Sequence, residues 1–248
     1  MYYFNDIKAM TYRSWKLGFR SVDAIITALA LPILILLAFV FIFGGAIDHT
    51  GQYIQYIVPG IIVMGVGQVA STTAVSLANS REKGILKRFK TMAINQTAVL
   101  YGEMNMTIFK VFCSLSVLLT TAYLLGFRSN FSGISFIQFA VILLLLTALI
   151  SWIGFLIGLR ASTDAASSFS FVLVFLPYLS SAFVDAETMP EFLQLIAKYS
   201  PFTWVTEAIR DAVYNQLSNQ DFLFTCGFLG VMLLIFAFWT TARYRKKT

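Results

Sequence analysis

Six long apolar runs constrain the fold of this chain more than any other feature of its sequence. Each is close to the roughly 20 residues that a helix needs to cross the hydrocarbon core of a bilayer. The runs cover residues 24–44, 57–78, 108–127, 134–159, 165–183 and 222–242. Hydrophobic residues make up 58% of the 248 positions and charged residues only 12%, which excludes an ordinary soluble domain. We expect an all-α integral membrane protein with six transmembrane helices in a single domain, 1–248.

The basic residues are distributed unevenly over the segments between these runs. If six helices alternate from a cytoplasmic N-terminus, fifteen of the 18 Lys and Arg residues lie inside, and only Arg128, Lys198 and Arg210 lie outside. This distribution follows the positive-inside rule. It also accounts for the formal charge of +6 without nucleic acid binding. We therefore expect both termini in the cytoplasm and the chain in the plasma membrane of a bacterium, with the lipid bilayer as a partner.

Residues 1–22 precede the first run and have the pattern of an amphipathic helix. Apolar side chains share one arc of the helical wheel: Tyr3, Phe4, Ile7, Met10, Trp15 and Leu17. Polar and basic side chains fill the opposite arc: Asn5, Lys8, Arg13, Lys16 and Arg20. This pattern predicts an N-terminal helix in the cytoplasmic interface, with Arg13, Trp15 and Lys16 at the membrane surface. Simple membrane anchoring would explain the same pattern.

The segment 81–92 is a charged island between the second and third runs. Its apolar residues Ile85, Leu86, Phe89 and Met92 fall on one face of a short helix, while Lys83, Lys87 and Lys90 point elsewhere. Such a helix can dock its apolar face on a partner. The cations alone could instead anchor the loop at anionic headgroups.

Two helix-packing signals lie within the apolar runs. Gln68, Thr72, Ser76 and Asn79 form one polar stripe along the second run. In lipid such groups need partners, so the stripe should face another helix or a water-filled path, and both readings stay open. Gly154 and Gly158 lie four residues apart in the fourth run, a spacing that permits close helix approach.

Two prolines after the fifth run predict a pair of short helices between spans five and six. Pro190 and Pro201 suit first-turn positions, and Thr188 and Ser200 can cap. Each piece is too short to cross the bilayer. We therefore expect an extracellular re-entrant or surface-lying hairpin over 188–216. It could be a gate or a stabilising element at headgroup level.

Three of these segments together resemble the permeases of type 2 ABC exporters, including the daunorubicin-resistance and nodulation-factor export groups. The order Leu-Pro-Tyr-Leu-Ser-Ser-Ala-Phe at 176–183, then Met189-Pro190, Ser200-Pro201 and Arg210, is similar to the family signature. The Tyr-x-x-Pro-Gly sequence at 56–60 resembles the start of the family's second span. The segment 81–88 resembles its coupling segment. The resemblance extends over nearly the whole chain.

The resemblance implies partners and site residues. The ATPase-coupling residues would be Arg81, Glu82, Lys83, Gly84, Ile85, Leu86 and Phe89. The outer gate would include Met189, Pro190, Pro201, Glu207 and Arg210. The pathway candidates are Gln68, Thr72, Ser76 and Tyr178. The family also implies a second permease chain, here expected as a homodimer, and two copies of an ABC ATPase subunit. Because this chain has no phosphate-binding Gly-rich loop, we expect it to bind no cofactor, with ATP and Mg on the ATPase.

The sequence carries no motif for chemistry within the membrane. The only histidine is His49, and Cys113 and Cys226 show no metal-ligand spacing. The central parts of the spans contain no ionisable residue, which disfavours an ion-coupled carrier. The leading function is therefore ATP-driven export of a hydrophobic or amphiphilic, drug- or lipid-like compound. Export of a lipid-linked glycan by the same fold, and a non-transporting membrane sensor or assembly partner of an ATPase, remain alternatives.

Overall fold

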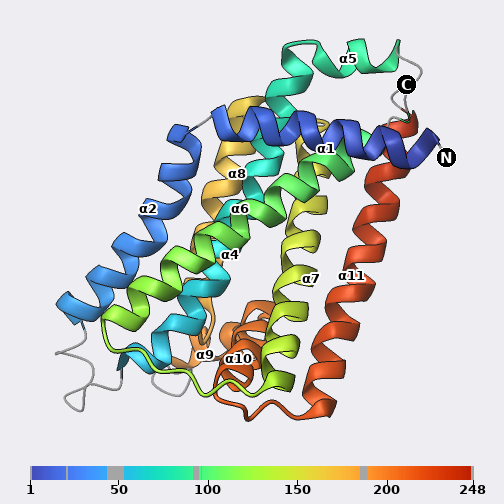
Figure 1. Cartoon of the computed structure of the whole chain (residues 1–248). Coiled ribbons are helices and arrows are strands. Elements are labelled where there is room, and N and C mark those ends of the chain that lie inside the picture. Colours follow the sequence, from blue (N-terminus) through green and yellow to red (C-terminus); the bar gives the residue numbers. More distant parts are fainter. Residues whose placement is uncertain are drawn as a thin grey trace.

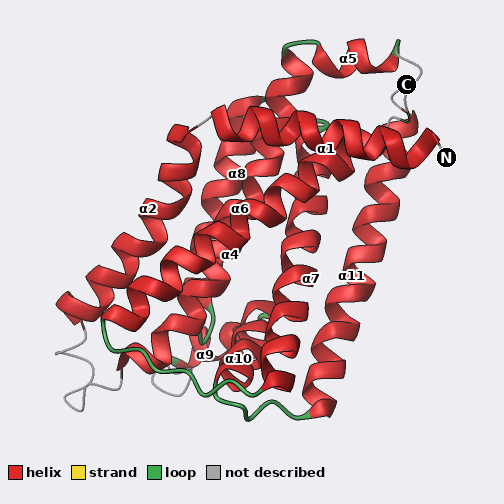
Figure 2. Cartoon of the chain, in the orientation of Figure 1, coloured by secondary structure: helices red, strands yellow, loops and turns green. Residues whose placement is uncertain are grey.

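Helices form all the regular structure in the residues that the computed structural model describes, which are 2–20, 22–43, 53–91, 95, 97–184 and 189–246 (Figure 1, Figure 2). In chain order they are α1 (Tyr2–Arg20), α2 (Val22–Ala38) with the π-helical turn η1 (Phe39–Phe43), α4 (Tyr53–Glu82), α5 (Ile85–Lys90), α6 (Thr97–Leu124), α7 (Gly133–Gly158), α8 (Thr163–Phe175) with the 3₁₀ turn η2 (Leu176–Leu179), α9 (Glu191–Tyr199), α10 (Pro201–Val213) and α11 (Asn219–Lys246).

Helix α4 is the central element of the bundle. It contacts α2, α6, α7, α8 and α10, and every residue from 57 to 67 is buried. Its second half is rich in Ala, Ser and Thr, small side chains that let neighbouring helices approach on several sides. The last helix, α11, lies at the edge and packs mainly against α7.

Among the described residues, four helices are long and apolar enough to cross a membrane: α4, α6, α7 and α11. The first and fifth expected spans correspond to shorter apolar helices, Ala30–Ile42 and Thr163–Leu179. The fifth changes from α-helix to 3₁₀ helix at Leu176, next to Pro177, whose ring nitrogen cannot donate a backbone hydrogen bond. The described residues thus confirm a membrane protein built from helices and give four of the six spans at full length.

Helix α6 begins eleven residues before the expected third span, at Thr97 instead of 108. The side chain of Asn95 caps its start by accepting from the Thr97 backbone N–H at 3.1 Å. The early turns include Glu103 and Asn105, polar residues that are satisfied by helix α1: the Asn105 side chain donates to Thr11 Oγ1 at 3.0 Å. The helix thus extends beyond the expected span at its start, because polar partners from another helix stabilise turns that an apolar run does not reveal.

The two ends of the bundle carry different elements. Helix α1 lies across one end, which it shares with α5 and the last turns of α11, and α9 and α10 lie at the opposite end (Figure 1). We call these the α1 end and the α10 end. At the α1 end, Met10, Leu86, Phe89 and Tyr244 belong to one buried apolar cluster. Helices from both halves of the chain therefore meet there.

Close approach of α7 to α4 depends on two glycines. A Cβ atom on Gly158 would lie 2.6 Å from the carbonyl oxygen of Ala74, and one on Gly154 would lie 2.5 Å from Thr73 Oγ1. Real Cβ atoms do not come so close. At Gly158 the neighbour is backbone, so no larger residue fits there without moving a helix, and at Gly154 the Thr73 side chain would have to rotate away. The close approach predicted from the Gly-x-x-x-Gly spacing is confirmed.

The pair of short helices expected over 188–216 is present as α9 and α10. Pro201 occupies the first turn of α10 after Ser200, whereas Pro190 precedes α9 and is not in its first turn. The Ser200 side chain makes no capping bond, and Thr188 lies outside the described residues. The apolar side of α10 faces the bundle, since its expected residues are all buried: Val205, Ala208, Ile209, Ala212 and Val213.

Candidate functional site

Helix α5 is a short element at the α1 end, and its apolar side faces this chain. A left-handed turn at Gly84, with φ of 70°, separates it from α4, a conformation that favours glycine. Leu86 is 5% and Phe89 8% exposed, and Arg13 of α1 lies over the Phe89 ring at 4.8 Å. The expectation that this apolar face docks on a partner is therefore wrong. The exposed side of the segment is charged: Glu82, Lys83, Lys87 and Arg88.

The expected coupling helix 81–92 is shorter than its sequence pattern, because Arg81 and Glu82 belong to the last turn of α4. The Arg81 guanidinium donates to the carbonyl oxygens of Leu159 at 2.8 Å and Ala161 at 2.7 Å. The Glu82 carboxylate accepts from the Thr163 backbone N–H at 2.9 Å and from its hydroxyl at 2.6 Å.

These four hydrogen bonds join the end of α4 to the turn between α7 and α8, and we call them the Arg81–Glu82 clamp. The arginine satisfies carbonyls at the end of α7, and the glutamate satisfies the first amide of α8. Both contacts are charge-assisted, which makes them stronger than ordinary hydrogen bonds. No local sequence pattern predicts the α7–α8 turn as the partner of this segment.

The buried face of helix α1 includes Ile7 and Met10 of the expected apolar arc but not Trp15 or Leu17. Met10, Ser14 and Gly18 are buried, whereas Trp15 and Leu17 are exposed, as is Lys16. Trp15 still contacts α6 at its edge, where its ring lies 4.7 Å from that of Phe109. Helix α1 thus presents a small-residue face to the protein and separate exposed aromatic positions, an arrangement typical of helices at a membrane interface.

Glu103 of α6 connects three helices and was not among the expected site residues. Its two carboxylate oxygens accept from Ser14 Oγ of α1 at 3.4 Å and from Ser76 Oγ of α4 at 3.3 Å. Ser76, one of the pathway candidates, therefore takes part in helix packing. A carboxylate near the start of an apolar helix was the available signal, but its partners lie 27 and 89 residues away.

The polar stripe of α4 is the part of this helix that the chain itself leaves least covered. Between 57 and 78 only Gln68, Thr72, Val75 and Ser76 escape full burial, and Asn79 beyond them is exposed. Thr72 donates within its own helix, to the Val69 carbonyl at 2.7 Å. The buried Oε1 atom of Gln68 has no hydrogen-bond partner among the described residues. Both side chains are only half-buried, so part of each lies open to contacts outside this chain.

The last pathway candidate, Tyr178, lies in an aromatic group at the α10 end. Its ring stacks on that of Phe183, with 4.3 Å between the ring centroids. The ring centroid of Phe39, in η1, lies 6.3 Å away. These contacts give Tyr178 a packing role between η2 and η1.

Arg210 and Glu207 of α10 form a compact polar cluster with Tyr56 and Ser181. The Arg210 guanidinium lies over the Tyr56 ring at 4.0 Å and donates to the Ser181 carbonyl oxygen at 3.1 Å. The Tyr56 hydroxyl donates to the same oxygen at 2.8 Å, and Ser181 Oγ donates to Glu207 at 3.1 Å. We call these four residues the Arg210 cluster. It fixes α10 to the start of α4.

The other expected gate residues lie apart from this cluster. Met189 is half-buried, and Pro190 is exposed before α9. Pro201 lines an apolar cavity described below. A further contact, not expected from the sequence, supports α10 from its far end: the Tyr214 hydroxyl donates to the Gln55 carbonyl oxygen at 2.7 Å. Burial raises the pKa of Tyr214 to about 12, so the phenol stays protonated and remains a donor.

Replacing Arg210 by alanine should lower the thermal stability of the purified protein by about 5 °C, because a partly desolvated cation–π contact and a hydrogen bond are lost together. Arg210→Lys keeps the charge but not the planar donor group, so its melting temperature should lie between those of the parent protein and Arg210→Ala. A fluorescence melting curve in detergent measures this effect. Lys198→Ala, at an exposed position of α9, is the matched control. An equal melting temperature for Arg210→Ala and Lys198→Ala would contradict the role of the Arg210 cluster.

Comparison with known proteins identifies the family of this chain. The family model described as "ABC-2 type transporter" matches residues 5–214, which include every candidate residue above. The chain belongs to the ABC-2 type transporter family. It is 30% identical over 227 residues to the daunorubicin resistance ABC transporter permease protein DrrB1 of Streptomyces coeruleorubidus, covering 90% of this chain and 80% of that protein.

More distant relatives within the family carry transport names as well. The putative transport permease ycf38 of Porphyra purpurea is 26% identical over 89% of this chain and 76% of its own length. The inner membrane transport permease YadH of Escherichia coli K12 is 24% identical over 84% of this chain and 82% of its own length. The chain is thus an ABC-2 transport permease subunit, and membership of the family implies association with an ABC ATPase subunit.

Proposed function

We propose that this ABC-2 permease is the membrane part of an ATP-driven exporter that moves a hydrophobic or amphiphilic compound out of the cytoplasm or the inner leaflet. A separate ATPase subunit, in two copies, would hold ATP and magnesium, and two identical permease chains would form the pathway. The observation that carries this proposal is the Arg81–Glu82 clamp. It links the exposed charged segment at the α1 end directly to helix α8.

The first step of the proposed mechanism is contact between the ATPase and the charged side of α5. Lys83, Lys87 and Arg88 are exposed there, so an acidic surface on the ATPase can meet them. Because Leu86 and Phe89 are held in the apolar cluster of the α1 end, α5 cannot move without its surroundings. A force on α5 therefore reaches the end of α4 and the clamp. The α1 end is then the cytoplasmic end, with both termini inside.

The second step carries this movement along α8. The buried centre of its contact with α4 is made of small side chains, Ala74 and Ala78 against Ala166, with Phe169 packed beside them. The Ser170 hydroxyl donates to the Ser71 carbonyl oxygen at 3.1 Å. A smooth contact of this kind lets one helix slide on another at small cost. A displacement of the α7–α8 turn would thus shift α8 beside the polar stripe of α4.

The polar stripe of α4 is an argument for a second permease chain beside this one. Polar groups at bilayer depth need partners other than lipid, and Gln68 and Thr72 lie on the side of α4 that this chain leaves partly open. Helix α8 adds Ser167 and Ser168, which are also exposed. A second copy of the chain would cover these surfaces and enclose a path between them. The Arg210 cluster at the opposite end would then close its outer exit, together with Met189 and Pro190.

The cargo class follows from how few polar groups the stripe offers. Two uncharged side chains can orient an amphiphile but cannot replace the hydration of a strongly polar molecule. The relative named for daunorubicin resistance supports a drug-like cargo. The proposed location is the plasma membrane of a bacterium.

Gln68→Leu tests the proposed path, because leucine fills the same space but has no polar atoms. We expect cargo transport into vesicles that contain the permease and its ATPase to fall about tenfold. This is the effect of losing one hydrogen bond between Gln68 and the cargo, worth about 1.4 kcal/mol. The melting temperature should stay unchanged, since Oε1 has no partner within the described chain. Leu234→Ala, on the exposed face of α11, is the control. Undiminished transport by Gln68→Leu would remove Gln68 from the path.

A further inference from the structure

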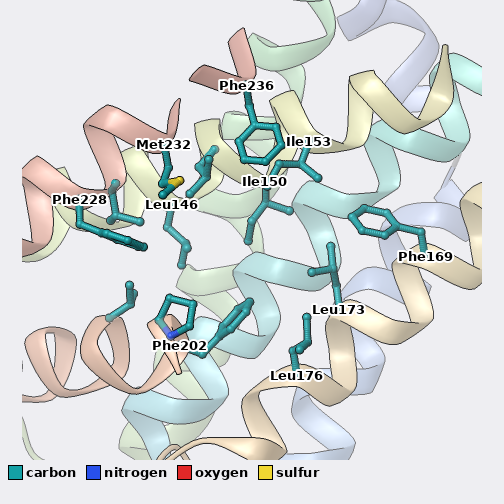
Figure 3. A pocket seen from close by; sticks show the side chains of 14 residues that line it. Leu146, Ile150, Ile153, Phe169, Leu173, Leu176, Phe202, Phe228, Met232 and Phe236 are labelled. Atoms are coloured by element: carbon teal, nitrogen blue, oxygen red, sulfur yellow. The ribbon is translucent and has the colours of Figure 1, made fainter. Parts of the chain in front are cut away.

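A wholly apolar cavity of about 270 Å³ lies between α7, α8, α10 and α11 (Figure 3). It shares no residue with the Arg81–Glu82 clamp, the polar stripe or the Arg210 cluster. Fourteen residues line it, and all of them have apolar side chains. Figure 3 shows Ile150 of α7, Leu173 of α8, Phe202 of α10 and Met232 of α11 around this space. No function discussed so far requires a cavity at this place.

Water cannot fill this cavity at acceptable cost. A buried water typically makes about three hydrogen bonds, and no side chain of the lining offers a polar partner. An engineered cavity of about 150 Å³ with Leu, Ile and Phe walls stays free of water and takes up benzene. The cavity described here is larger and has the same kind of wall. A hydrocarbon therefore suits this cavity better than water does.

The helices around the cavity indicate that such a hydrocarbon would come from the bilayer. Two walls, α7 and α11, are long enough to span the membrane, and α11 is the least covered of the four candidate spans. Val231 and Leu234, which flank Met232 on α11, are exposed apolar residues at bilayer depth. Pro201 at the α10 side of the cavity is exposed as well, so the space reaches the surface of the chain. Acyl chains of the bilayer are the solvent that touches this surface.

We propose that the cavity binds one acyl chain of a bilayer phospholipid, which enters beside α10 while its headgroup stays outside the protein. The chain would fill the space between α11 and α8 and support the apolar packing of α10 on the bundle. This binding site is independent of the proposed export function. It would be occupied in the resting permease, in the absence of ATP.

Photolabelling tests this site in the full-length permease in bilayer nanodiscs. The probe is a phosphatidylglycerol with a diazirine in the middle of one acyl chain, and the labelled residues are identified by mass spectrometry. We expect label on the α11 residues of the lining, which are Phe228, Leu229, Met232 and Phe236. Met232→Trp fills the cavity and should reduce this label about tenfold, because the methylene groups of the chain lose their burial. Leu234→Trp, two residues away on the exposed face, should leave it unchanged.

A second measurement keeps the test valid if Met232→Trp folds poorly. Native mass spectrometry of the unmodified permease, released from nanodiscs, should retain one phospholipid per chain, and the conservative variant Ile153→Phe should retain less. Label spread evenly over the exposed residues of α11, with no excess at the cavity, would overturn the proposal. Displacement of the photolipid by added daunorubicin would overturn it too, because the cavity would then be a cargo site.

Discussion

Replacing Gly158 by leucine should abolish the folded permease. The first side-chain atom would lie 2.6 Å from the Ala74 carbonyl oxygen and 3.0 Å from the Leu77 Cβ atom. The nearest neighbour is backbone, so it cannot rotate away, and the clash must separate α7 from α4. Overpacking of a well-packed core typically costs about 1–3 kcal/mol, and the cost is higher here because the clash is with helix backbone. The expected result is loss of the monodisperse peak in size-exclusion chromatography.

The matched control for this variant is Gly230→Leu in α11. A Cβ atom there meets no other atom within 4 Å, so the same substitution adds bulk without a clash. Gly230→Leu should purify like the parent and gain slightly in helix stability, since glycine costs a helix about 1 kcal/mol. A monodisperse Gly158→Leu protein with the melting temperature of the parent would contradict the packing of α7 on α4.

Breaking the Arg81–Glu82 clamp should uncouple transport from ATP hydrolysis. Arg81→Ala removes two charge-assisted hydrogen bonds to the α7–α8 turn, each worth about 1.5–3 kcal/mol. A coupling free energy of about 3 kcal/mol corresponds to a factor of roughly 150. We therefore expect vesicle transport to fall about a hundredfold. ATP hydrolysis by the complex and binding of the ATPase should be retained, because the charged face of α5 is unchanged.

Arg160→Ala is the control for the clamp, because Arg160 is an exposed arginine of the same turn. It should transport at the parental rate. The double variant Arg81→Ala/Glu82→Gln should be little worse than Arg81→Ala alone, since both residues act on one turn. If Arg81→Ala transported as fast as Arg160→Ala, the movement of α5 would not be transmitted through the clamp to the α7–α8 turn.

The helices whose pattern reflects their lipid or water surroundings were predictable from the sequence. Runs of apolar residues long enough to cross hydrocarbon identify α4, α7 and α11 within a few residues, because lipid imposes the same requirement along the whole helix. The face of α10 was predictable for a similar reason, since an amphipathic helix must bury its apolar side. The close contact at Gly154 and Gly158 also followed from the spacing of the residues.

The contacts between distant segments were not predictable. The partners of Arg81 and Glu82 lie 78 to 81 residues further along the chain, and no local pattern indicates them. The direction of the apolar face of α5 also depends on tertiary structure, because Leu86 and Phe89 could be covered by a partner or by this chain. Glu103 was missed for the same reason. It follows a charged segment in the sequence, and its contacts with α1 and α4 are apparent only in the folded chain.

Transport by the permease and its ATPase, co-purified and placed in inside-out vesicles with a fluorescent amphiphilic compound as the probe, tests the coupling mechanism most directly. The coupling mechanism predicts uptake that requires hydrolysable ATP, stops with a non-hydrolysable analogue and is lost in Arg81→Ala while ATP is still consumed. Uptake that proceeds without the ATPase under an ion gradient would contradict it. So would ATP-driven uptake that is unaffected when Lys87 and Arg88 are both changed to glutamate.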